Sequence, residues 1–273
     1  MVAVEIEDTE APTRFDMMRV VRRTLGLLRR NLAVFLWFGF VFAALPQAAM
    51  YWGMSTFGIS AALGVSGAPA VIAFALGAVG SVLGWAVLQA ALIYAAIGDL
   101  NGRRTSLDVL LYAGLRFVFP LVGLGVLMTL ALAAGAVLLI APALFLATIW
   151  IAAAPMLVIE RLDAVECLRR SARLTKGRRW PVFGLVIAGL LISWVLREAA
   201  SRLGLAAAYA GLDTSMNMLG SSIPQNPGLL TLAAAGSRSL VGAVMSLITG
   251  LGVASIYWEL KATRTTPVDD TFD

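Results

Sequence analysis

Long apolar runs without charge constrain this chain more than any motif does. Residues 117–159 contain no charged side chain, and a helix of that length would be roughly twice as long as the 30 Å thickness of a bilayer core. The stretch therefore has to turn once. We place the turn between Ala133 and Pro142, because proline is tolerated in the first turn of the helix that follows. A composition of 60% hydrophobic and 14% charged residues is typical of a polytopic membrane protein.

The apolar runs predict an all-α membrane protein with six spans. They lie at about residues 32–52, 70–98, 117–136, 141–159, 181–196 and 239–258, within a single membrane domain covering residues 13–264. Residues 1–12 and 265–273 are polar, and we expect disordered tails there. A secretory signal peptide is the competing interpretation of residues 32–45, with cleavage near Ala48 and Ala49. The preceding segment is long and rich in acidic residues, which favours an intact first helix.

Basic residues gather between particular spans. Of the 21 lysines and arginines, only Arg197, Arg202 and Arg238 lie outside the four segments 14–30, 103–116, 161–179 and 261–264. The positive-inside rule therefore predicts that these four segments, and with them both termini, are cytoplasmic. This arrangement indicates a multi-pass protein of a cytoplasmic membrane. Anionic lipid headgroups are the expected counter-charge rather than nucleic acid, since the basic residues border apolar spans.

Three cytoplasmic segments share a pattern and predict an amphipathic interfacial helix before each of three two-span hairpins. They begin at Phe15-Asp16, Leu107-Asp108 and Leu162-Asp163. In the first, apolar residues recur at three- and four-residue spacing, at Met18, Val21, Leu25 and Leu28. In the third, the less polar stripe is Ala164, Leu168, Ala172 and Thr175. Pairs of a capping residue and a carboxylate mark the expected helix starts at Thr13 with Asp16, Thr105 with Asp108, and Asp163 with Glu166.

Residues 155–184 read PMLVIERLDAVECLRRSARLTKGRRWPVFG. This segment resembles the signature of the bacterial multi-pass family named after the glycerophosphoryl diester phosphodiesterase membrane domain. The positions that match are Pro155, Glu160, Ala164 or Val165, Leu168, Arg170, Ser171, Leu174, Thr175, Lys176 and Gly177. Members that gave the family its name carry a soluble phosphodiesterase domain after the membrane part, whereas this sequence stops at Asp273. The resemblance therefore implies a membrane module and no hydrolase chemistry.

Within this segment we expect structural and lipid-contacting roles. Glu160 is expected to pair with Arg161 or Arg170 at the membrane boundary, and Ser171 to act as a packing or capping hydroxyl, because no base lies beside it. Cys167 is expected to be a half-buried small side chain. The basic cluster offers contacts to anionic lipid or to a partner, with a topology signal as the plainer interpretation; it comprises Arg169, Arg170, Arg173, Lys176, Arg178 and Arg179.

Small residues at four-residue spacing predict close helix packing at Gly80 and Gly84 in the second span, and at Gly242, Ser246, Gly250 and Ala254 in the sixth. Packing inside one bundle and self-association through the sixth span are both compatible with this pattern. Pro46 and Pro155 are candidate kinks.

Several function classes lack the residues that they require. Histidine is absent and Cys167 is the only cysteine, so we expect no metal, no cofactor and no catalytic site. No ionisable residue lies in the centre of a predicted span, which argues against coupled transport. The prediction is a non-catalytic membrane protein that contacts anionic lipid or a partner at its inner face, with a role in organising the envelope or assisting transport, and with a homo-oligomer as one form of partnership. The alternative is an uncoupled channel or carrier for a lipid-like or weakly polar substrate, lined by Gln47 and Gln89.

Overall fold

The computed structural model describes residues 15–62, 68–102, 106–138, 140–211 and 227–262, and every regular element in them is a helix. Six helical segments are long and apolar enough to cross a membrane: Leu32–Met54, Ala68–Leu100, Val118–Ala136, Ala143–Glu160, Arg179–Gly204 and Leu232–Ala262. The all-helical class and the presence of six candidate spans therefore agree with the expectation from sequence. The arrangement as three membrane hairpins and its orientation stay predictions, and the expected tails lie outside the described residues.

The first candidate span is built from α2 (Leu32–Gly39), a short π-helix η1 (Phe40–Ala44) and α3 (Leu45–Ala62). The π-helix ends just before Pro46. Because Pro46 has no N–H to donate to the preceding turn, the helix widens there, and this widened turn is the irregularity expected from the candidate kink at Pro46. Helix α4 (Ala68–Leu100) runs antiparallel to α3, and the two helices are in close contact along much of their lengths.

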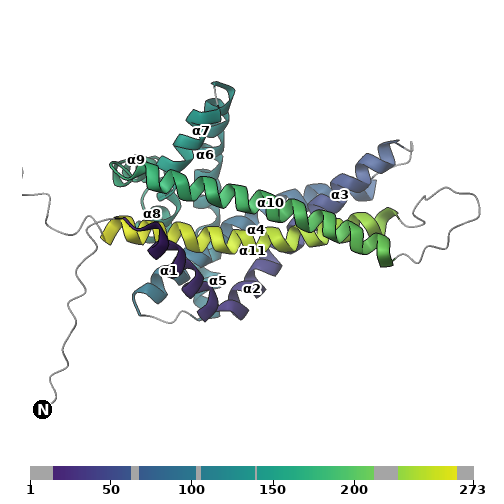
Figure 1. Cartoon of the computed structure of the whole chain (residues 1–273), viewed down its shortest axis with the longest axis horizontal. Coiled ribbons are helices and arrows are strands. Elements are labelled where there is room, and N and C mark those ends of the chain that lie inside the picture. The colour runs from purple at the N-terminus through teal and green to yellow at the C-terminus, as the bar shows by residue number, and fades with distance from the viewer. Residues whose placement is uncertain (1–14, 63–67, 103–105, 139, 212–226, 263–273) are drawn as a thin grey trace, which may run out of the picture.

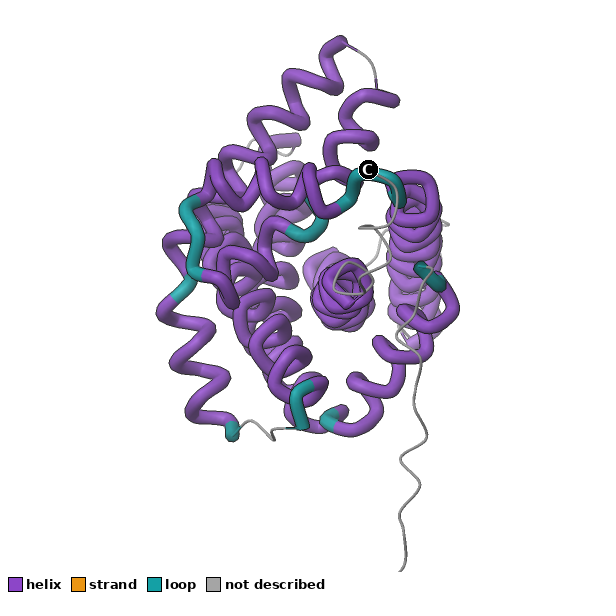
Figure 2. Tube along the Cα trace, turned by 90° about the vertical axis from the view of Figure 1, so that its left-hand side faces the viewer, coloured by secondary structure: helices purple, strands orange, loops and turns teal. Residues whose placement is uncertain are grey.

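The last two spans are longer than their charge-free cores. Helix α10 (Arg179–Gly211) continues through Arg197 and Arg202, and α11 (Pro227–Ala262) includes Arg238. Residues 203–211 continue α10 without a break, since a charged side chain on a helix surface does not interrupt the backbone hydrogen bonds. Helices α10 and α11 run alongside one another and are in close contact, and α11 also packs on α3 and α4 (Figure 1). Figure 2 shows helices and loops but no strand in the described part of the chain.

The middle part of the chain forms a separate projection. Helix α6 (Val118–Leu138) packs against α7 (Ile140–Ile149), and in Figure 1 this pair stands at a steep angle to α10 and α11. Pro142 lies in the first turn of α7, as expected. The fourth span then breaks at residues 150–152 and resumes as α8 (Ala153–Glu160). Pro155 accounts for the break, because its ring would clash with the carbonyl of Ile151 in a continuous helix.

Short helices precede three of the spans, as the sequence pattern predicts. They are α1 (Met17–Arg30), α5 (Leu107–Arg116) and α9 (Ala164–Leu174). Asp16 itself caps α1, since its Oδ1 accepts a hydrogen bond of 2.8 Å from the backbone N–H of Met18. Ser106 precedes α5, and its side-chain hydrogen bond lowers the pKa of Asp108. Asp163 lies at the start of α9 but its side chain makes no capping hydrogen bond. Thr13 and Thr105, the remaining expected capping residues, lie outside the described residues.

The side of α1 that packs against the protein is not its apolar stripe. Val20, Thr24 and Leu27 are buried, whereas Met18 and Leu25 are more than half exposed. The reason is the ionic contact between α1 and α11 described below, which turns the face next to Arg19 and Arg23 toward the bundle. In α9 the buried residues are Cys167, Leu168, Ser171 and Thr175, while the expected Ala172 is only half-buried.

Candidate functional site

A buried carboxylate near the end of α11 fixes α1 to the bundle. The Glu259 side chain has no exposed surface, and its two oxygens accept hydrogen bonds from Arg19 Nη1 at 2.7 Å and Arg23 Nη1 at 2.9 Å. The two arginines are one helical turn apart and therefore share a face of α1. Since a buried charge is stable only when it is paired, this contact determines how α1 lies.

A second carboxylate lies at the same end of α11. Tyr257 Oη donates a hydrogen bond of 2.7 Å to Glu160 Oε1, while Arg170 Nη1 lies 3.0 Å from Glu160 Oε2 and Lys261 Nζ lies 3.7 Å from Oε1. Of the two partners expected for Glu160, the structure pairs Arg170. Arg161 instead adopts a left-handed conformation (φ 53°) that ends α8. We call these groups, with Glu259, Arg19 and Arg23, the Glu259 cluster.

Two hydroxyl groups from residues 155–184 also hold the break in the fourth span together. Ser171 Oγ donates a hydrogen bond of 2.8 Å to the Ile149 carbonyl and accepts one of 3.2 Å from the Ala152 N–H. Thr175 Oγ1 lies 3.4 Å from the same carbonyl. Ser171 and Thr175 are fully buried, so they satisfy backbone groups that have lost their helical partners. Gly177 has a φ of +88° in the turn that follows α9, a conformation that favours glycine.

Several members of the predicted basic cluster have partners within the molecule. Arg170 belongs to the Glu259 cluster, Arg173 Nη2 lies 3.1 Å from Glu166 Oε1, and the Arg179 guanidinium carbon lies 5.5 Å from the centre of the Phe145 ring. Arg178 also interacts within the chain. Arg169 and Lys176 are exposed, and no ion pair joins them to another described residue. The six basic residues are thus divided between internal contacts and a free surface.

The outer face of α1 combines apolar and basic side chains. Met18 is 55% exposed and Leu25 53% exposed, and Val21 lies beside them on the same face. Arg22 and Arg29 are exposed next to these residues, and neither forms an ion pair with another described residue. Helices that lie in the interface of a membrane present this mixture of side chains.

Cys167 is buried in the middle of α9. Its Sγ lies 3.6 Å from the Leu162 carbonyl oxygen. Burial raises the pKa of the Cys167 thiol to about 11, and the negative charge of Glu160 adds to the increase. The thiol is therefore neutral at physiological pH and lacks the thiolate character of a reactive cysteine.

Glycines allow α3 and α4 to approach at backbone distance. A Cβ added at Gly84 would clash with the Phe42 carbonyl, and one added at Gly80 would lie 3.3 Å from Pro46 Cβ. Phe42 is four residues before Pro46, so its carbonyl has no helical donor at that position. The missing side chain of Gly84 leaves the space that this carbonyl occupies.

The small residues of α11 pack inside the same molecule. A Cβ at Gly242 would lie 2.7 Å from Gln47 Oε1, and a Cβ at Gly250 would lie 2.9 Å from Gln89 Oε1. Ser246 Oγ donates to the Gly242 carbonyl at 2.9 Å, and Ala254 is fully buried. This face of α11 is therefore covered by α3 and α4, which favours packing within one bundle over self-association.

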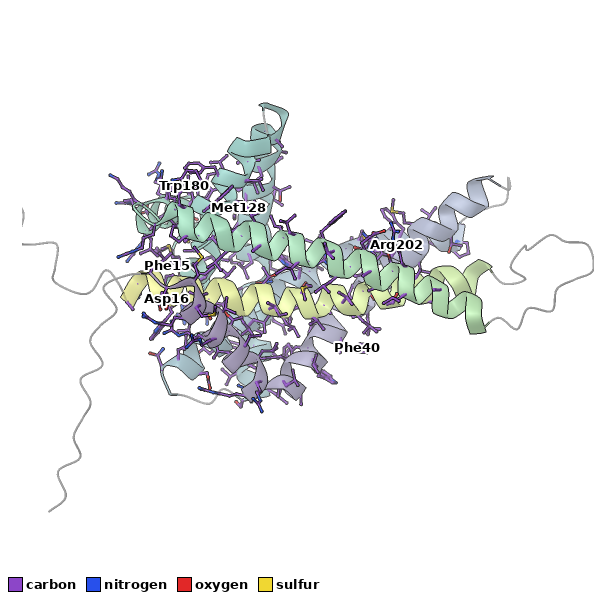
Figure 3. The ribbon with its side chains drawn as sticks, in the orientation of Figure 1. Phe15, Asp16, Phe40, Met128, Trp180 and Arg202 are labelled. Atoms are coloured by element: carbon purple, nitrogen blue, oxygen red, sulfur yellow. The ribbon has the colours of Figure 1, made fainter. Side chains whose placement is uncertain are left out.

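A second ionic cluster lies well away from the first. It comprises Gln47 of α3, Arg197 and Glu198 of α10, and Arg238 of α11, and we call it the Arg197 cluster; Arg202 borders it and pairs with Glu198 on its own helix. Figure 3 shows Arg202 far along α10 from the end of the molecule that holds Phe15 and Asp16. At 1.5 Å per residue, Arg238 and Glu259 are about 32 Å apart along α11. A bilayer hydrocarbon core is about 30 Å thick.

Sequence reasoning located most of these groups but missed how they pair. The contact between Arg19 and Glu259 joins residues separated by 240 positions, and nothing local identifies such a partner. The i, i+4 spacing of Arg19 and Arg23 was the available signal, since two arginines on one helix face can share a carboxylate.

No group of three or more potential metal ligands among histidine, cysteine, aspartate and glutamate occurs in the described part of the chain. Comparisons with protein-family models, with curated proteins and with solved structures found no match. The resemblance of residues 155–184 to a membrane-domain family stays a prediction.

Proposed function

We propose that this protein is a non-catalytic, multi-pass protein of the bacterial cytoplasmic membrane that holds anionic lipid headgroups at its inner face. In this proposal it helps to organise the envelope or assists a transport system. The observation that carries the proposal is the outer face of α1. It is fixed in place by Glu259 on one side and presents Met18, Leu25, Arg22 and Arg29 on the other.

The physical argument combines burial and charge. Exposed Met18 and Leu25 gain free energy by inserting among acyl chains, at about 25 cal/mol per Å² of apolar surface. The neighbouring Arg22 and Arg29 would then meet the lipid phosphates, and each basic group near an anionic leaflet contributes about 1 kcal/mol. Arg169 of α9 and Lys176, in the turn that follows α9, are further exposed basic residues without an ion-pair partner among the described residues.

The orientation in this proposal follows from the charge asymmetry of the loops. Reporter fusions after residues 102 and 170 should both report the cytoplasm, and a fusion after residue 215 should report the outside. Opposite compartments for the first two fusions would refute the topology.

Lipid titration tests the inner-face contact itself. The full chain, purified in a neutral detergent, would be titrated with phosphatidylglycerol and with phosphatidylcholine, and bound lipids counted by native mass spectrometry. The double variant Arg22→Gln/Arg29→Gln should bind anionic lipid about thirtyfold more weakly, since two charge contacts of about 1 kcal/mol each are lost. Arg202→Gln, which removes the same kind of charge elsewhere, is the control. Equal affinity for both lipids, or equal losses in both variants, would contradict the proposal.

The channel or carrier alternative receives less support from the structure. Its candidate lining residues, Gln47 and Gln89, lie against Gly242 and Gly250 in helix contacts, and Gln89 is 6% exposed. These contacts fill the space that a polar path between α3, α4 and α11 would require.

A further inference from the structure

The Arg197 cluster carries more positive than negative charge among the described residues. Glu198 is its only described carboxylate, and it is shared by Arg202 Nε at 3.1 Å and Arg238 Nη1 at 3.8 Å. The second distance is too long for a hydrogen bond. Arg197 forms no ion pair or hydrogen bond with another described residue, and its Nε is buried without an acceptor. Among the described residues, Arg197 therefore has no ion-pair partner, and Arg238 has only the long contact with Glu198 and the Tyr51 ring.

The geometry brings these groups to one place between three helices. The position that a Cβ on Gly242 would take lies 3.8 Å from Arg197 Cζ and 2.7 Å from Gln47 Oε1. Gln47 Oε1 is buried and has no donor. The Arg238 Nε is also buried without an acceptor, although its guanidinium lies 5.3 Å from the centre of the Tyr51 ring. The missing side chain of Gly242 thus lets a polar group from α3 and a cation from α10 approach α11 closely.

The surroundings of Arg197 are those of a lipid-facing helix. The three residues that precede it on α10, Trp194, Val195 and Leu196, are 67%, 53% and 42% exposed. An arginine beside such a surface is costly unless it meets an anion or water at the membrane boundary. A phosphate group suits it well, because a planar guanidinium can donate two parallel hydrogen bonds to phosphate oxygens.

We propose that the Arg197 cluster binds the phosphate of an anionic phospholipid between α3, α10 and α11, with Arg197 and Arg238 as the two cationic contacts and the side-chain N–H₂ of Gln47 as a third donor. The separation of about 32 Å between Arg238 and Glu259 along α11 places the site in the leaflet opposite to the Glu259 cluster. This inference rests on the proposed membrane topology and is independent of the inner-face lipid contact. A soluble phosphate ion has the same chemistry, but the apolar surface beside Arg197 favours a ligand with acyl chains.

Native mass spectrometry of the full chain in neutral detergent tests this site. Phosphatidylglycerol would be titrated into the wild-type protein and into Arg197→Gln, Arg238→Gln and Arg202→Gln. A hydrogen bond to a charged group contributes about 1.5–3 kcal/mol. Loss of Arg197 or Arg238 should therefore weaken the tightest-bound lipid about tenfold or more. Arg202→Gln should leave the affinity within about twofold, because Arg202 is not one of the two cationic contacts. Unchanged binding by Arg197→Gln, or equal losses in all three variants, would overturn the proposal.

Two further experiments test the position of the site and whether its ligand is a lipid or a free phosphate ion. Gly242→Ala keeps every charge but adds a methyl group beside Gln47 and Arg197, so it should weaken the same lipid while the helix content in circular dichroism stays unchanged. Normal lipid affinity in this variant would count against the site. In the second experiment, inorganic phosphate replaces the lipid. It should neither stabilise the protein nor displace phosphatidylglycerol, and protection by phosphate alone would overturn the assignment to lipid. The Arg22→Gln/Arg29→Gln variant should retain this lipid, which distinguishes failure here from failure of the inner-face contact.

Discussion

Removing one hydroxyl should destabilise the fourth span more than its size suggests. In Ser171→Ala, the Ile149 carbonyl loses a donor at 2.8 Å and the Ala152 N–H loses an acceptor at 3.2 Å. Neither group has a helical partner, because the chain is broken at residues 150–152. A buried polar group left without a partner costs about 1–3 kcal/mol. Thr175 Oγ1, at 3.4 Å from the same carbonyl, can offset part of one loss, so we expect a decrease of about 2–3 kcal/mol in the free energy of unfolding.

The matched control is Ser246→Ala. The Ser246 hydroxyl donates to the carbonyl of Gly242 within its own helix at 2.9 Å, and that carbonyl keeps its backbone donor when the hydroxyl is removed. The control should therefore change the free energy of unfolding by less than about 0.5 kcal/mol. The double variant Ser171→Ala/Thr175→Val should lower the free energy of unfolding by more than Ser171→Ala alone, because the Ile149 carbonyl then has no side-chain donor.

Reversible unfolding in mixed micelles, with increasing sodium dodecyl sulfate and circular dichroism as the signal, provides the measurement. The difference between Ser171→Ala and Ser246→Ala tests the reasoning directly, since both variants exchange serine for alanine. Equal stability of the two variants would show that the Ser171 hydroxyl does not support the break.

Three further predictions address packing, charge and the thiol. Gly84→Ala should lower the free energy of unfolding by about 1–3 kcal/mol, because its Cβ clashes with the Phe42 carbonyl. Gly252→Ala is the control, because a Cβ there meets nothing within 4 Å, and it should leave the free energy of unfolding unchanged or raise it by up to about 1 kcal/mol. The same unfolding assay measures both variants, and equal changes in their free energies of unfolding would exclude the clash. Glu259→Gln should lower the free energy of unfolding by about 3 kcal/mol and release α1 from the bundle, which would be measured as faster tryptic cleavage near Arg19. An unchanged cleavage rate would show that Glu259 does not hold α1 in place. Cys167 should resist maleimide at neutral pH until the protein is unfolded. Because its pKa rises from 9.0 to about 11 on folding, stability should fall as pH increases through that interval, and rapid labelling of the folded protein would contradict its burial.

The Ser171 contact shows where sequence reasoning stopped. The absence of a neighbouring base predicted a packing or capping hydroxyl, and Pro155 predicted an irregularity in the fourth span. The sequence could not join the two, because the hydroxyl lies on α9 and its partners lie before α8. Only the return of α9 against the broken span brings them within hydrogen-bonding distance.

The same distinction explains the unexpected face of α1. Hydrophobic periodicity identified Met18, Val21 and Leu25 as the apolar stripe of an interfacial helix, and periodicity does select apolar faces. In a chain whose solvent includes lipid, an apolar face need not be turned toward the protein. The buried pairing of Arg19 and Arg23 with Glu259 decided the rotation of the helix instead.

Hydropathy and charge along the chain were enough to determine six candidate spans, the short helices before three of them and the division of the basic segments. These properties depend on the transfer of local segments from water to an apolar medium and on backbone hydrogen bonds within each helix, so neighbouring residues suffice to define them. Tertiary structure decided which carboxylates are buried, which arginines remain unpaired and how the broken fourth span is closed. Those outcomes depend on pairs of groups far apart in sequence, whose free energy of interaction exists only once the helices have packed.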